Sequence, residues 1–212
     1  MKSLPTSYTA ARKWGIILLL ALASLGAALL SMSFGSTQVP FSEILTALMG
    51  GETQAYNIVV YARLPRTLAA LLCGSALAVG GVIIQGVLGN PLAGPNIIGV
   101  NAGAGLGAVL CAALIPTSMT AVPVAAFLGA LGACMLVYTL ARRTGASRIT
   151  LVLAGVAISS MLSAAIDAVS ILFPEAALGA GSFMVGRLSG VTVAALKVPA
   201  LLSLLALSLI HI

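Results

Sequence analysis

Charged side chains are what this sequence most lacks. Only 7% of its 212 residues are Asp, Glu, Lys or Arg, whereas 60% are hydrophobic. A soluble domain carries about 25% charged residues, so these few cannot cover a water-soluble globule. The ten basic residues outnumber the four acids but are scattered through apolar sequence and form no basic patch interleaved with aromatic residues, which argues against a nucleic-acid-binding protein. We therefore expect a lipid bilayer to solvate the chain.

Metal-binding and catalytic residues are also scarce. The three cysteines, Cys73, Cys111 and Cys134, lie far apart in apolar runs, and the single histidine, His211, stands beside the last residue. Neither pattern offers the clustered ligands of a zinc site or the close pairs of a disulfide framework. The chain also has no nucleophile triad, paired carboxylates or phosphate-binding loop with its lysine. We predict no metal, no cofactor and no enzymatic activity.

Long apolar runs are abundant. A bilayer core requires about 20 apolar residues per helix, and unpaired backbone groups in hydrocarbon cost several kcal/mol each, so the runs are predicted to be helices. The fold class expected is an all-α, polytopic transmembrane helical bundle forming one permease-like domain over residues 1–212. The six predicted spans are 15–34, 67–87, 96–115, 122–141, 150–173 and 191–212.

Basic residues predict the orientation. Three of them precede the first span, and three lie in the loop ARRTGASR between the fourth and fifth spans. Because basic residues favour the cytoplasmic side, we expect a cytoplasmic N-terminus and place both groups inside. Arg63 and Arg66 then fall outside, against the rule. They are either arginines that snorkel at the interface or a docking point for an acidic partner.

An amide-rich and glycine-rich segment interrupts the apolar sequence between the second and third spans. It reads QGVLGNPLAGPNIIGVNAGAGLG, from Gln85 to Gly107. Pro91 and Pro95 each lack a backbone donor and disfavour helix in the preceding residue, so 89–95 is predicted to be a non-helical turn. The segment is either a re-entry buried against other protein or an ordinary turn, which also favours Asn, Pro and Gly.

This segment belongs to a longer block that resembles a known family. Residues 63–110 read RLPRTLAALLCGSALAVGGVIIQGVLGNPLAGPNIIGVNAGAGLGAVL. The block is similar to the signature of the iron-siderophore, haem and cobalamin importer permeases, the type II ATP-driven importers of bacterial inner membranes called the FecCD family. LVLAGVAIS, at 151–159, resembles the fifth span of that family. The residues that form the signature turn and its helix packing are Gln85, Asn90, Pro91, Pro95, Gly99 and Gly103.

The resemblance implies roles for particular residues. Arg63 and Arg66 match arginines that accept glutamates from the extracytoplasmic substrate-binding protein. Ser147 and Thr150 lie where the family has its cytoplasmic gate. Further implied partners are cytoplasmic ATPase subunits and a second permease copy or homologue, which together make a dimeric importer in the bacterial inner membrane. FMVGRLSG, at 183–190, departs from the family because Arg187 replaces a small residue and a nearby tryptophan is missing.

The chain is shorter than the family pattern. We expect it to be the N-terminal part of a longer permease, and the ending LSLIHI, at 207–212, resembles a translated sequencing adapter. The function predicted is the import of an iron-siderophore, or of a related chelate such as haem or cobalamin. Two alternatives stay open. One is a secondary transporter driven by an ion gradient, for which the candidate residue is Asp167, the one acid within a predicted span. The other is a structural membrane subunit without a pathway.

Overall fold

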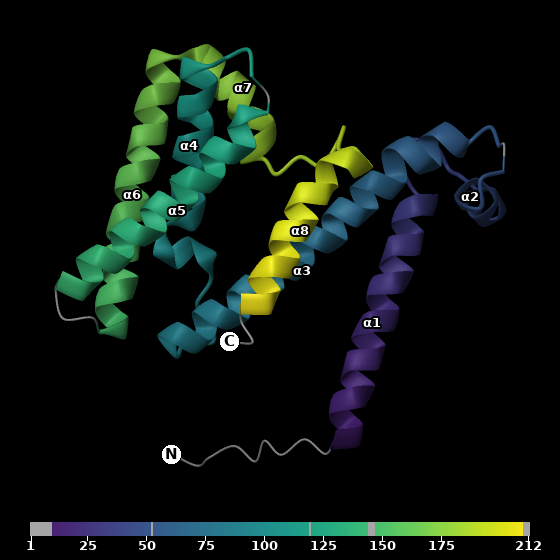
Figure 1. Cartoon of the computed structure of the whole chain (residues 1–212), viewed down its shortest axis with the longest axis horizontal. Coiled ribbons are helices and arrows are strands. Elements are labelled where there is room, and N and C mark those ends of the chain that lie inside the picture. The colour runs from purple at the N-terminus through teal and green to yellow at the C-terminus, as the bar shows by residue number, and fades with distance from the viewer. Residues whose placement is uncertain (1–9, 52, 119, 144–146, 210–212) are drawn as a thin grey trace. The chain divides into compact units, whose positions relative to one another are not determined.

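The computed structural model describes residues 10–51, 53–118, 120–143 and 147–209, and these ranges form helices without any strand (Figure 1). The predicted all-α transmembrane class is confirmed. Within the described ranges, four helical runs are long and apolar enough to cross a bilayer. They are α1 (Ala10–Ser33), the continuous run Ile58–Leu88, α5 (Ala121–Arg143) and α6 (Arg148–Leu172).

Two shorter apolar helices occupy the remaining predicted spans. α4 (Val100–Leu114) has 15 residues and is therefore about 22 Å long, less than the roughly 30 Å of a hydrocarbon core. α8 (Val193–Leu209) has 17 residues, and residues 210–212 of the sixth predicted span lie outside the described part of the chain. The number of spans therefore stays a prediction.

The long helices expose apolar side chains in a way that requires lipid. Met32 is the one buried residue that α1 contributes among its 24. Trp14 and Leu19, on the same helix, are 70% and 66% exposed. An apolar surface of this extent is not stable in water, whereas hydrocarbon solvates it and the helix satisfies its own backbone groups.

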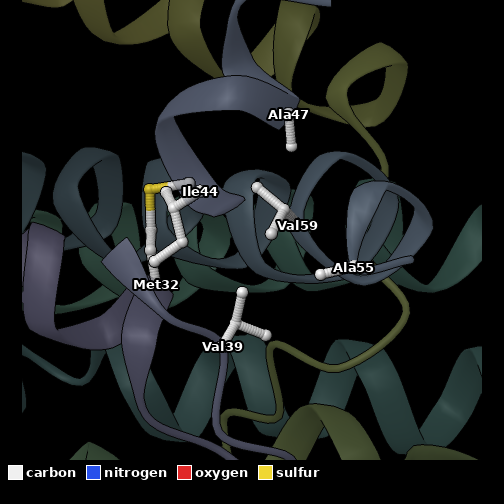
Figure 2. Packing of buried hydrophobic residues seen from close by; sticks show 6 residues of the cluster. All are labelled: Met32, Val39, Ile44, Ala47, Ala55 and Val59. Atoms are coloured by element: carbon white, nitrogen blue, oxygen red, sulfur yellow. The ribbon is translucent and has the colours of Figure 1, made fainter. Parts of the chain in front are cut away.

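The chain divides into two compact units. This division does not test the prediction of a single domain. The first unit comprises Met1–Gly74 and Leu188–Ile212. α3 (Leu64–Leu88) begins in it and continues into the second unit, Ser75–Arg187. In the first unit the end of α1, α2 (Phe41–Leu48) and the π-helical segment η1 (Ile58–Arg63) enclose a small apolar core (Figure 2). The residues of this core are Met32, Val39, Ile44, Ala47, Ala55 and Val59.

The second unit is a bundle built around α4. This helix contacts α5, α6 and α7 (Pro174–Met184), which surround it in Figure 1. At Gly103, a methyl group would overlap the Gly129 carbonyl of α5, so the two backbones touch. Small residues permit such close approach, so Gly103 lies where α4 and α5 are packed closely against each other's backbone.

Several helix positions differ from the predictions. The second helical run starts at Ile58 rather than 67, because η1 continues directly into α3. α4 starts at Val100 rather than 96, after the short 3₁₀ helix η2 (Pro95–Ile98). α2 and α7 lie outside all six predicted spans. Both helices are too short to resemble a membrane span.

Candidate functional site

Arg63 is a buried arginine at the end of η1. Its side chain is 9% exposed. Nη1 donates to the carbonyl oxygens of Met32 and Ser33, the latter at 2.9 Å, and Nη2 donates to the carbonyl oxygen of Thr37. All three acceptors belong to one short segment, 32–37, at and just after the C-terminus of α1. Hydrogen bonds that involve a charged donor are stronger than neutral ones, so the guanidinium fastens this segment to η1.

Arg66 lies in a different environment, although it is only three residues further along the same helical run. Its side chain is exposed. Arg63 and Arg66 both line a cavity of about 480 Å³ within the first unit, together with Ser36, Tyr61 and Ser189. A cationic group at an open, partly polar cavity suits an acidic or anionic partner. The two arginines that the sequence placed together therefore differ in how much of their charge faces outward.

The segment from Gln85 to Gly107 contains a turn that leads into α4, and the last residue of this turn, Gly99, is buried. Gly99 adopts a left-handed conformation, with φ of 78°, which glycine tolerates best, and it forms the junction between η2 and α4. Asn90 caps its own turn, since its Oδ1 accepts from the Leu92 amide at 2.9 Å. Asn101 donates to the side chain of Asn96. Residues 89–94 are non-helical, as predicted, whereas Pro95, the last residue of the predicted turn, begins η2.

The two halves of this segment have different neighbours. η2 packs against α6, where Gly155 lies against the Ile97 backbone and the Ser159 hydroxyl donates to the Asn96 carbonyl at 3.4 Å. Pro91, in contrast, is exposed. The half around Pro95 is packed against protein. The half around Pro91 is an exposed turn that begins at the Gln85 carbonyl, which accepts from the Asn90 amide. A re-entry into the membrane at this segment stays a prediction.

Ser147 and Thr150, the predicted gate residues, form the start of α6. Ser147 is its N-cap, and its Oγ accepts from the Thr150 amide at 3.0 Å. The two side-chain hydroxyls are also 2.7 Å apart. Residues 144–146 of the same loop lie outside the described part. The geometry explains the local role of both residues as a helix cap, and their role as a gate stays a prediction.

Ionisable groups elsewhere are dispersed. Asp167 on α6 and Glu175 in the first turn of α7 are both exposed in the isolated chain. Among the described residues no three His, Cys, Asp or Glu side chains gather closely enough to hold a metal ion. Sequence reasoning missed the three backbone carbonyls that accept hydrogen bonds from Arg63, because every residue has a backbone carbonyl whatever its side chain.

The described residues form apolar helices, four of them long enough to cross a bilayer, which pack through small residues around the turn before α4. These features define a multi-pass membrane protein of the permease class. The chain belongs to the FecCD transport family, which residues 18–212 match.

Individual relatives agree with the family. The chain is 37% identical over 179 residues to the Fe(3+) dicitrate transport system permease protein FecD of Escherichia coli K12, covering 84% of this chain and 55% of that protein. It is 40% identical over 165 residues to the ferric enterobactin transport system permease protein FepD of the same organism, covering 76% of this chain and 48% of the relative. The chain thus spans about half the length of these relatives.

A solved structure has a similar fold. The chain is similar, with a TM-score of 0.60 and 26% identity, to a structure described as an inward-facing conformation of a metal-chelate type ABC transporter, covering 77% of this chain and 50% of the other. The resemblance of the sequence block at 63–110 to importer permeases is therefore confirmed at the level of family and fold.

Proposed function

We propose that this chain is the N-terminal part of the membrane-spanning permease of an ATP-driven importer for a ferric chelate. The family match over 18–212 carries the proposal. Its support comes from relatives whose names specify iron chelates: ferric dicitrate, ferric enterobactin and, at 32% identity over 152 residues, haem-iron in Staphylococcus aureus MSSA476. The permease supplies a pathway and forms or breaks no covalent bond.

The mechanism proposed requires three kinds of partner. An extracytoplasmic binding protein delivers the chelate to the outer mouth, where Arg63 and Arg66 line the cavity. A second permease copy or homologue completes the pathway, and cytoplasmic ATPase subunits drive the rigid helices between two arrangements. The location proposed is the bacterial inner membrane with the N-terminus inside. Arg142 and Arg143 in the last turn of α5 support this orientation.

Reconstitution tests the energy source. Proteoliposomes would contain the complete permease and its genomically neighbouring ATPase, with the binding protein and a radiolabelled ferric chelate outside and ATP inside. We expect uptake with ATP, and uptake at background level when the Walker lysine of the ATPase is replaced. An imposed proton gradient without ATP should give no uptake. Accumulation driven by the gradient alone, in vesicles without the ATPase, would instead support the secondary transporter.

A further inference from the structure

Arg63 binds a segment far from it in the chain. The acceptors Met32, Ser33 and Thr37 precede it by 31, 30 and 26 residues. The first two belong to the last turn of α1, whose carbonyls have no partner within the helix. Ser33 also accepts from the Val39 amide at 3.2 Å. A cation at this point complements the negative end of the helix dipole and fixes the turn by which the chain leaves α1.

The shape of the guanidinium suits this arrangement. A planar fork can reach several fixed carbonyls at once, whereas a lysine ammonium is a compact charge that cannot reproduce the fork. The backbone passes close to the Arg63 guanidinium: at Gly35, an added methyl group would lie 3.1 Å from Nη2. Arginine keeps its charge in proteins, so at 9% exposure the carbonyl dipoles compensate a permanent charge.

The segment that Arg63 holds is also a wall of the outer cavity. Phe34, Gly35 and Ser36 line this cavity together with the exposed Arg66. The family resemblance implies docking for both arginines. We propose that the two have separate roles. Arg63 is a positioning residue that fixes the wall 34–36, and Arg66 presents the charge that receives an acidic group of the binding protein. This inference rests on the proposed function.

Hydrogen exchange tests the positioning role directly. The complete permease would be assembled with its ATPase in nanodiscs, and exchange would be followed in peptides covering 33–40. With Arg63→Gln we expect exchange there to accelerate about tenfold or more, because several charge-assisted hydrogen bonds are lost. Arg63→Lys should accelerate it as well, since one ammonium cannot replace the fork. Arg66→Gln is the matched control and should leave these peptides unchanged.

Docking at several salt concentrations separates the two roles. Arg66→Gln should lower the affinity for the binding protein about two- to fivefold at low salt, with a smaller salt dependence than the wild type, and Arg66→Lys should retain most of the affinity. Arg63→Lys should lower the affinity while the salt dependence stays that of the wild type. The reason is that a loosened wall must be ordered on binding, whereas the outward charge at Arg66 is unchanged.

The two measurements fail independently. Unchanged exchange in both Arg63 variants, or full docking affinity in Arg63→Lys, would overturn the positioning role. A wild-type permease that does not bind the binding protein would instead overturn the proposed function, and the exchange data would still decide whether Arg63 holds the segment. Arg63→Lys keeps the charge, so the test does not depend on whether the glutamine variant folds.

Discussion

At the scale of single residues, Gly155 determines how close α6 can approach the signature turn. A methyl group at this position would overlap the Ile97 carbonyl oxygen of η2. Backbone cannot give way as the end of a flexible side chain can, so the contact requires glycine. The neighbouring hydrogen bond from Ser159 to the Asn96 carbonyl joins the same two elements.

Replacing Gly155 by alanine is therefore expected to lower the stability of the complete permease by about 1–3 kcal/mol, the usual cost of overpacking. The measurement is the thermal unfolding midpoint in detergent. Gly132→Ala on α5 is the control, because nothing lies within 4 Å of the added methyl group, and it should be neutral or stabilising by about 0.5–1 kcal/mol. Equal midpoints for both variants would show that α6 does not depend on this contact.

At the scale of elements, the start of α6 combines a structural role with a predicted functional one. Ser147 caps the helix through the Thr150 amide. An aspartate can serve as the same cap, whereas alanine cannot. The cap and the gate can therefore be tested separately at one position.

We expect Ser147→Ala to lower stability by about 1 kcal/mol and Ser147→Asp to keep it near that of the wild type. Thermal unfolding measures the stability of each variant, and ATP-driven uptake in proteoliposomes measures its transport activity. If Ser147 acts only as a cap, uptake follows stability in both variants. Lost uptake in a fully stable Ser147→Asp variant would instead assign the hydroxyl to the gate.

Helix positions show where sequence reasoning succeeded. Hydropathy located α1, α5 and α6 within a few residues, because a run of apolar side chains is a local property that a bilayer reads directly. It missed α2, although Pro40 precedes it and apolar residues recur on one face of FSEILTAL. It also missed α7, where Pro174 and Glu175 form a typical first turn. Both helices are too short for a search based on membrane thickness.

At the scale of the whole molecule, the orientation across the bilayer is the prediction that all assigned roles share. Ser36, at the cavity, should be extracytoplasmic, and Arg143, at the end of α5, should be cytoplasmic. Both side chains are exposed, so a cysteine at either position can react with a probe.

The test uses the complete permease with every native cysteine replaced, Cys73, Cys111 and Cys134 among them, in spheroplasts treated with a membrane-impermeant maleimide. We expect Ser36→Cys to be labelled in intact spheroplasts and Arg143→Cys only after lysis. The opposite pattern would invert the topology, and docking of an extracytoplasmic protein at Arg66 would then be impossible.

The sequence by itself determined the solvent, the helical class and the family, because composition, hydropathy and a contiguous motif do not depend on distant residues. Only the tertiary structure distinguished Arg63 from Arg66. The two side chains are chemically identical and three residues apart, so local sequence treats them alike. Their difference arises because the carbonyls of Met32, Ser33 and Thr37, at and just after the end of α1, all accept hydrogen bonds from the Arg63 guanidinium. Backbone acceptors far apart in the sequence reach such positions only when the chain folds.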